Sequence, residues 1–156
     1  MKKLKVSDFE KHRLYILVRT DLPSMNPGRA MAQAAHASNQ FIFKYGNGLN
    51  VKKWQADRGF GTTIVLGVTQ MELENAVDMG LNRMEIAALV YDPTYSYTLP
   101  MEIAECIDRK TYTDTPIFKA NDEVTFFRKE LTCGYIFISN NSPHKQDIVN
   151  ALPLHP

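Results

Sequence analysis

The stretch DLPSMNPGRAMAQAAHASNQF, residues 21–41, contains the start of the longest helix that the sequence predicts. The side chain of Asn26 can accept hydrogen bonds from the first helical turn. Pro27 suits the first helical position because its missing N–H is not needed there. Arg29 is unusual, since a cation in the first turn opposes the helix dipole at a cost of about 0.3–1 kcal/mol. An anion held by both the helix N–H groups and the guanidinium would compensate that cost.

The same helix, expected over residues 28–45, carries a polar stripe beside a stripe of small apolar residues. Spacings of four, three and four residues place the polar side chains on one face: Arg29, Gln33, His36 and Gln40. The neighbouring alanines, extended by Ala32 and Ala35, allow close packing on a sheet. Two interpretations stay open. The polar stripe borders a ligand-binding cleft at the end of the first strand, or it faces solvent with His36 merely hydrogen-bonded.

Four segments have the near-continuous apolar and β-branched composition of strands covered on both faces: residues 13–20, 62–69, 85–92 and 134–140. A helix is expected between the second and third of them, with a capping box at Thr69 and Glu72 and with Gly80 as a suitable C-cap. Because this helix leads from one strand to the next, we expect a right-handed crossover and parallel pairing of the two strands.

Residues 98–131 interrupt this alternation of strands and helices. Of these 34 residues twelve are charged, and only LPMEIAECIDRK, residues 99–110, has a helical pattern. We therefore expect an insertion before the last strand, a surface lid or docking element that adds little to the core. The whole chain, residues 1–156, is predicted to be a single domain.

The composition is that of an ordinary soluble protein, with 44% hydrophobic and 22% charged residues. Neither the two cysteines nor the four histidines have the spacing of a metal site, which favours a reduced, cytoplasmic protein without a metal or cofactor. No apolar run is long enough to cross a membrane, and the N-terminus lacks the features of a signal peptide. Charge is uneven, however: residues 1–60 contain eleven Lys and Arg against four Asp and Glu. This balance indicates a negatively charged partner for the first half, or a chance bias on a solvated surface.

A second group of polar side chains occurs in YDPTYSYTLP, residues 91–100. The third strand is expected to end at Asp92, and the hydroxyls that follow it, among them Tyr95 and Ser96, could help it to orient a water or a sugar hydroxyl. The tyrosines could also stack on bases. The alternative is a common Asx turn at Asp92 with aromatics filling a local core. Thr132, just before the last strand, gives no signal by itself.

Together these segments resemble the type II peptidyl-tRNA hydrolases. LVRTDLPSMNPGRAMAQAAHAS is similar to that family's opening block, a strand ending in R-x-D-L, a K-G-K loop and A-A-Q-x-x-H-A on the first helix. AALVYDPTYSY resembles the strand that ends in D-A-G-R-T-Q, and ELTCGYIFIS resembles P-G-T with the closing strand. The resemblance covers roughly 100 residues in the right order, and the Q-x-x-H-A block is its most specific part.

The resemblance implies an α/β fold with a four-stranded mixed β-sheet and helices on both faces, often dimeric. It also implies a metal-free hydrolase of the ester that joins a peptide to the tRNA 3′ end. The residues that it assigns to catalysis are Asp92, Thr132, Ser96 and His36. Those that it assigns to substrate binding are Arg29, Gly28, Gln33 and Asp21, and Tyr95 is added to them as a candidate for stacking on a base.

The chain departs from the family pattern at the loop and at the third strand. The first lysine of K-G-K, counted among the family's catalytic residues, falls on Pro27, and the loop is one residue longer. The Gly-Arg of D-A-G-R-T is replaced by Thr94-Tyr95. The alternative function is therefore a non-catalytic module that binds tRNA or a nucleotide, with the insertion docking a protein partner. Arg19, Lys44 and Lys52 are the cations considered as replacements for the lysine.

Overall fold

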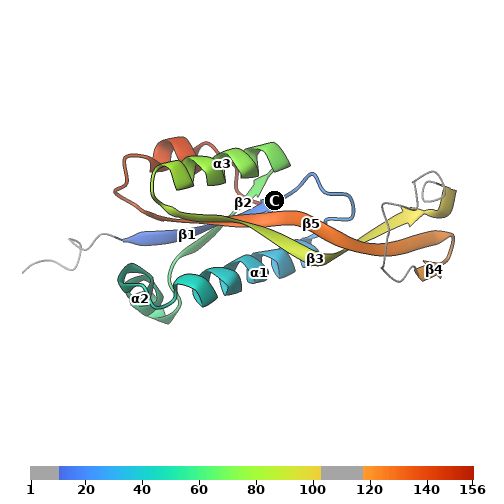
Figure 1. Ribbon diagram of the computed structural model, residues 1–156, viewed down its shortest axis with the longest axis horizontal. Helices are drawn as coiled ribbons and strands as arrows, with labels where there is room; N and C mark the ends of the chain where they lie inside the picture. The colour runs from blue at the N-terminus through green and yellow to red at the C-terminus, as the bar shows by residue number, and fades with distance from the viewer. Residues whose placement is uncertain (1–10, 103–117) are drawn as a thin grey trace, which may run out of the picture.

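The structure, a computed structural model, describes residues 11–102 and 118–156 (Figure 1). Its elements in chain order are β1 (His12–Arg19), α1 (Pro27–Tyr45), α2 (Leu49–Ala56), η2 (Asp57–Gly59), β2 (Thr63–Val68), α3 (Gln70–Asn82), β3 (Ile86–Pro100), β4 (Phe118–Ala120), β5 (Glu123–Ser139) and η4 (Gln146–Asn150). The N-terminal residues 1–10, Cys106 and most of the helix expected over residues 99–110 lie outside the described residues.

The sheet is mixed and has the order β2-β1-β5-β3, with the short β4 added beside β5. β1 pairs with β2 in parallel, and β5 runs antiparallel to both β1 and β3. The α/β fold class with its four-stranded mixed sheet is therefore confirmed. β2 and β3 run in the same direction, but the expected pairing between them is wrong, because β1 and β5 lie between them.

Helices cover both faces of this sheet, with α1 and α2 on one side and α3 on the other (Figure 1). Alternate residues of β1 enter two separate cores. Leu14, Ile16 and Val18 pack with α1 and α2, whereas Tyr15 and Leu17 pack with α3 and η4. This double burial explains the near-continuous apolar run of the strand. None of the helices in the described part combines the length and the apolar character that a membrane span needs.

The two long helices, α1 and α3, have the predicted N-terminal caps, but the C-terminal end of α3 differs from the prediction. Asn26 accepts a hydrogen bond from the backbone N–H of Arg29, and Thr69 and Glu72 form the capping box of α3. Gly80, however, is not the C-cap: α3 continues to Asn82 and is capped at Arg83. Gly80 instead faces the sheet, where an added Cβ would lie 3.1 Å from the Cβ of Ala87.

β3 and β5 extend beyond the body of the sheet as a two-stranded arm (Figure 1). β3 does not end at Asp92 but continues to Pro100, which pairs with Glu123. Pro93 suggested a strand end, but it lies in an irregularity of an edge strand, where its missing N–H breaks no ladder bond.

The described ends of the predicted insertion, residues 98–102 and 118–131, are therefore largely strand. The prediction that this region adds little to the core is wrong for these residues. Buried side chains of the arm form a small third core with the loop after β1: Leu22, Tyr95, Tyr97 and Phe126. The remainder of the predicted insertion, residues 103–117, lies outside the described residues. The arm thus has an apolar core of its own that fixes its position against the loop.

The C-terminal residues run along the outer edge of β2. The N–H of Gly67 donates to the carbonyl of Pro153 at 3.1 Å, and the N–H of His155 donates to the carbonyl of Val65 at 3.1 Å. Leu66 and Leu154 form an antiparallel bridge between these bonds. This tail, residues 153–156, therefore covers an edge of the sheet that would otherwise be open.

Candidate functional site

The helix α1 carries the residue that organises the candidate site. Gln33 is 4% exposed, and its side chain lies between β3 and β5. Its Nε2 donates to Oδ2 of Asp92 at 2.6 Å, and its Oε1 accepts a hydrogen bond from the hydroxyl of Thr132 at 2.6 Å. One buried amide thus joins three of the residues that sequence reasoning selected, and we name this group the Asp92–Gln33–Thr132 cluster.

A β-bulge places Thr132 in this cluster. Val90 pairs with Cys133 and the next residue, Tyr91, pairs with Leu131, so Thr132 is the extra residue of β5. The side chains of Thr132 and Cys133 consequently both reach α1, where the Cys133 thiol donates to the carbonyl of Gln33 at 3.3 Å. Burial raises the pKa of the Cys133 thiol to about 12, so the thiol stays protonated.

Asp92 has two different sets of partners for its two carboxylate oxygens. Oδ2 receives the Gln33 amide, whereas Oδ1 receives the backbone N–H of Thr94 at 2.9 Å and the Thr94 hydroxyl at 3.4 Å. The second set is the Asx turn that the sequence offered as an alternative to a functional role. The turn and the contact with Gln33 exist together, and the turn holds the carboxylate toward the helix.

Arg29 lies one turn before Gln33 on α1 and contacts the arm. Its Nη1 donates to the carbonyls of Ser24 and Ser96, at 2.8 and 2.9 Å. Its guanidinium carbon lies 5.7 Å from the centre of the Tyr95 ring. Two backbone carbonyls therefore compensate the cation at the helix start, the role that the sequence analysis gave to an anion.

Three other predicted site residues lie outside the Asp92–Gln33–Thr132 cluster. His36 is exposed on α1, and no described residue accepts or donates a hydrogen bond to its ring. Tyr95 is 2% exposed, and its hydroxyl donates to the carbonyl of Pro23 at 3.3 Å. Gly28 is exposed at the start of α1. The outer positions Ala32 and Ala35 are also exposed, so the expectation that they extend the packed surface is wrong.

Asp21 is part of an ion-pair network that runs from β1 to the arm. Its Oδ1 accepts a hydrogen bond from Nε of Arg19 at 2.8 Å, and its Oδ2 accepts the backbone N–H of Gln70 at the start of α3 at 3.1 Å. Partial burial works to raise the pKa of Asp21, but the bonds from Arg19 and Gln70 outweigh it and lower this pKa.

Sequence reasoning missed the other end of this network, which is centred on Glu130. Glu130 accepts the Tyr97 hydroxyl at 2.5 Å, the Arg128 guanidinium at 2.6 Å and Nη1 of Arg19 at 3.3 Å. Burial, followed by the carboxylate of Glu130, raises the pKa of Tyr97 to about 12. Burial opposes ionisation of Glu130 too, yet its hydrogen bonds with Tyr97 and Arg128 lower its pKa. Arg128 lies two residues before Glu130 on β5, but Tyr97 comes from β3 and Arg19 from β1. Strand pairing brings these three elements together, so local spacing could not have indicated the network.

The cations considered as replacements for the missing loop lysine are placed elsewhere. Arg19 is 6% exposed and bound to Asp21, Glu130 and the carbonyl of Leu131. Lys44 lies in the last turn of α1, and Lys52 lies on α2. Arg19 thus reaches Glu130, which pairs with Asp92 across the two strands, but it is held there by its own partners. Arg29, which is not one of these three cations, contacts the arm at the carbonyl of Ser96. Within residues 11–102 and 118–156, no group of three or more His, Cys, Asp or Glu side chains is placed to hold a metal ion.

Comparison with known proteins gives three results. The model of a family described as peptidyl-tRNA hydrolase PTH2 matches residues 12–106, a range that includes Gln33 and Asp92 and ends before Thr132. No curated protein matches the chain. Among solved structures, the fold is similar to that of a protein of unknown function from Agrobacterium tumefaciens strain C58, with 12% identity and a TM-score of 0.51, over 95% of this chain and 100% of the other.

Proposed function

Because this chain belongs to the peptidyl-tRNA hydrolase family of type II, we propose that it hydrolyses the ester bond between a peptide and the 3′ end of tRNA. The observation that carries this proposal is the Asp92–Gln33–Thr132 cluster. It combines a carboxylate, an amide and a hydroxyl at fixed positions beside the start of α1. Such an ester is already activated, so positioning and electrostatic stabilisation are sufficient aids to its hydrolysis.

In this proposal Asp92 orients and deprotonates the attacking water. Oδ1 of its carboxylate accepts both the N–H and the hydroxyl of Thr94, whereas Oδ2 accepts the Gln33 amide and has a second lone pair that can accept a hydrogen bond from water. The water oxygen attacks the ester carbonyl while its proton passes to Asp92. The bond between the carbonyl carbon and the ribose oxygen then breaks as Asp92 delivers the proton to that oxygen, so that the products are a free tRNA hydroxyl and a peptide carboxylic acid.

The hydroxyls of Thr132 and Ser96 are the proposed donors to the ester carbonyl. In the free protein the Thr132 hydroxyl donates to Oε1 of Gln33. When this hydroxyl rotates toward the substrate, it exchanges that acceptor for the ester carbonyl. Ser96 lies on the arm at the point where Arg29 binds its carbonyl. Donors that meet the developing negative charge of the carbonyl oxygen stabilise the transition state more than the ground state.

Arg29 and the first N–H groups of α1 are the proposed phosphate-binding groups, with Gly28 allowing close approach to the backbone. Only one of the three guanidinium nitrogens, Nη1, is used in the two bonds to carbonyls. His36, which is exposed one turn beyond Gln33, is the proposed contact to the terminal nucleotide. Asp21 and Tyr95 are proposed to act indirectly, since Asp21 pairs with Arg19 and Tyr95 packs against Arg29.

The test is the turnover of a labelled peptidyl-tRNA by the purified full chain and by Asp92→Asn. The substitution removes the charge needed for the general base, and turnover should fall by roughly 100-fold or more. The exposed Asp78→Asn on α3 makes the same change of charge and should turn over like the wild type. Wild-type activity in Asp92→Asn would show that the assignment is wrong.

The absence of the loop lysine supports a second function, tRNA binding without hydrolysis. Pro27 stands at the lysine position, and both carboxylate oxygens of Asp92 already have protein partners. If the wild type binds tRNA but releases no peptide, and Arg29→Ala weakens that binding, the second function replaces the first. A homodimer, a protein partner at residues 98–131 and a cytoplasmic location stay predictions.

A further inference from the structure

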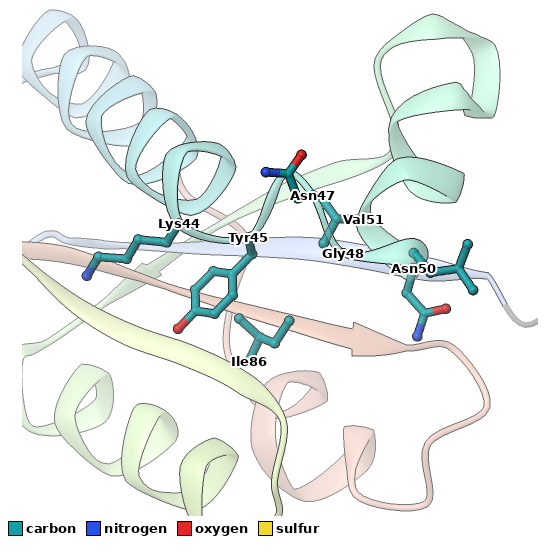
Figure 2. Close-up of a pocket in the computed structure, with 8 residues that line it drawn as sticks. Lys44, Tyr45, Asn47, Gly48, Asn50, Val51 and Ile86 are labelled. Carbon is teal, nitrogen blue, oxygen red and sulfur yellow. The ribbon is translucent and has the colours of Figure 1, made fainter.

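A hollow of about 400 Å³ lies between the end of α1, the start of α2 and the start of β3 (Figure 2). No residue of the Asp92–Gln33–Thr132 cluster lines it. The side chains that characterise it are Lys44, Tyr45, Asn47, Asn50, Val51 and Ile86. Figure 2 shows Tyr45 and Ile86 lying between Lys44 on one side and Asn50 on the other. The hollow thus has an apolar centre with a cation and amides at its rim.

The polar groups at this rim are free to bind a ligand. Lys44, Asn47 and Asn50 are exposed, and within the described part of the chain none of their side chains has an ion-pair or hydrogen-bond partner. The first turn of α2 contains no acidic residue, and no side chain caps it. Nothing in this part of the rim therefore repels an anion.

Two buried polar atoms of the same helix–sheet interface also lack partners among the described residues. They are Oε1 of Gln40, one turn before Lys44, and the hydroxyl of Tyr135, whose ring lies edge-on to Tyr45 with the centroids 6.5 Å apart. Burial, followed by the neighbouring Tyr45, raises the pKa of Tyr135 to about 12, so its hydroxyl keeps its proton. Neither residue lines the hollow itself. Because buried polar atoms are usually hydrogen-bonded, these two show only that the interface next to the hollow has polar groups that the described residues do not satisfy.

We propose that this hollow binds a nucleotide of the tRNA strand upstream of the ester, an inference that rests on the proposed function. A base would lie against Tyr45 and Ile86, the amides of Asn47 and Asn50 would bond its edge, and Lys44 would meet a phosphate. RNA is the favoured occupant because every element of the rim except Ile86 belongs to residues 1–60, the segment with eleven Lys and Arg against four Asp and Glu.

The distance between the two sites fits one RNA chain that contacts both. Gln33 and Lys44 are separated by eleven residues of α1, which corresponds to about 16 Å along a helix. The hollow would therefore add affinity for the tRNA without touching the ester. It would set the Michaelis constant rather than the chemical step.

The test measures binding of deacylated tRNA by fluorescence anisotropy, with the full chain and with Asn50→Asp and Lys44→Gln. Asn50 is the second residue of α2, where an acidic side chain favours the helix dipole, so Asn50→Asp adds a repelling charge without weakening the fold. The dissociation constant of deacylated tRNA from Asn50→Asp should be about fivefold or more above the wild-type value. Lys44→Gln should lower the slope of log affinity against log salt by about one. Asn75→Asp, which adds the same charge on the exposed side of α3, should bind like the wild type.

The outcomes separate this inference from the proposed function, because deacylated tRNA has no ester. Binding by Asn50→Asp and Lys44→Gln at the wild-type level overturns the inference, even if Asp92 governs hydrolysis. An equal loss in Asn75→Asp overturns it as well, since net charge alone would then explain the effect. Weakened binding in a protein that hydrolyses nothing would keep the hollow as an RNA site and reject the esterase function.

Discussion

The substitution Gln33→Leu tests whether the Asp92–Gln33–Thr132 cluster holds the fold together as well as the site. Gln33 is only 4% exposed, and Leu has a similar volume, so it can fill the same space. The change deletes both side-chain bonds of Gln33. Thr132 is fully buried, and its hydroxyl loses its oxygen acceptor and is left with only the weak sulfur acceptor of Cys133 at 3.7 Å. Asp92 loses one of its donors.

The expected loss of stability follows from these two bonds. A buried hydroxyl left without a partner costs about 1–3 kcal/mol, and a hydrogen bond to a charged group contributes about 1.5–3 kcal/mol. Burial of the apolar Leu side chain offsets part of this sum. We therefore expect Gln33→Leu to lower the free energy of unfolding by about 2–4 kcal/mol. For a chain of this size that corresponds to a fall in Tm of roughly 4–16 °C.

Urea unfolding followed by circular dichroism gives the measurement, with two comparison variants. Gln40→Leu, the same substitution two turns later, removes a buried oxygen that has no described partner and should be neutral or stabilising. The double variant Gln33→Leu with Thr132→Val no longer has the buried hydroxyl that Gln33→Leu leaves without its amide partner. Its loss of unfolding free energy should therefore be smaller, by about 1 kcal/mol or more, than the sum of the losses in the two single variants. Simple additivity, or a Gln33→Leu variant as stable as the wild type, would refute the cluster as a stabilising unit.

Three further predictions concern charge. Arg29→Ala should weaken tRNA binding in a filter-binding assay and lower the slope of log affinity against log salt by about one. Single-turnover hydrolysis with saturating enzyme should be retained. An unchanged slope would contradict a phosphate contact. Asp21 and Glu130 have lowered pKa values, so the stability they contribute is complete above their ordinary values of 3.8 and 4.5 and is lost as the pH falls below them. Arg19→Met should flatten this acid dependence of the unfolding free energy, and an unaltered pH profile would argue against the network. Glu130→Gln should lower the pKa of Tyr97 from about 12 toward its ordinary value, seen as tyrosinate absorbance at lower pH; an unmoved titration would assign the shift to burial alone.

Local patterns were enough to predict the body of the fold. The four apolar segments became β1, β2 and the inner parts of β3 and β5, because strands covered on both faces need near-continuous apolar residues. The caps at Asn26 and Thr69 were also predictable from local sequence, because each depends on residues only three positions apart. The spacing of α1 predicted a single polar stripe, but this stripe is divided: Gln33 is buried with Ala30 and Ala37, whereas His36 is exposed.

The arm and the position of Thr132 could not be predicted in this way. Pro93 signals the end of a strand in any local pattern, and its acceptance depends on β3 being an edge strand, which is a property of the whole sheet. The bulge at Thr132 depends on the register of β5 against β3. The network between Arg19 and Glu130 joins residues 111 positions apart. These features arise from strand pairing, which single-sequence periodicity does not contain.

The tail along β2 has a consequence for how the protein behaves at high concentration. A truncation after Ala151 would leave the Asp92–Gln33–Thr132 cluster intact but remove the bonds of Pro153 and His155 to β2. The bare edge would then offer the N–H of Gly67 and the carbonyl of Val65 to any extended chain, including the same edge of a second molecule. We therefore expect a chain truncated in this way to self-associate, and light scattering would reveal it.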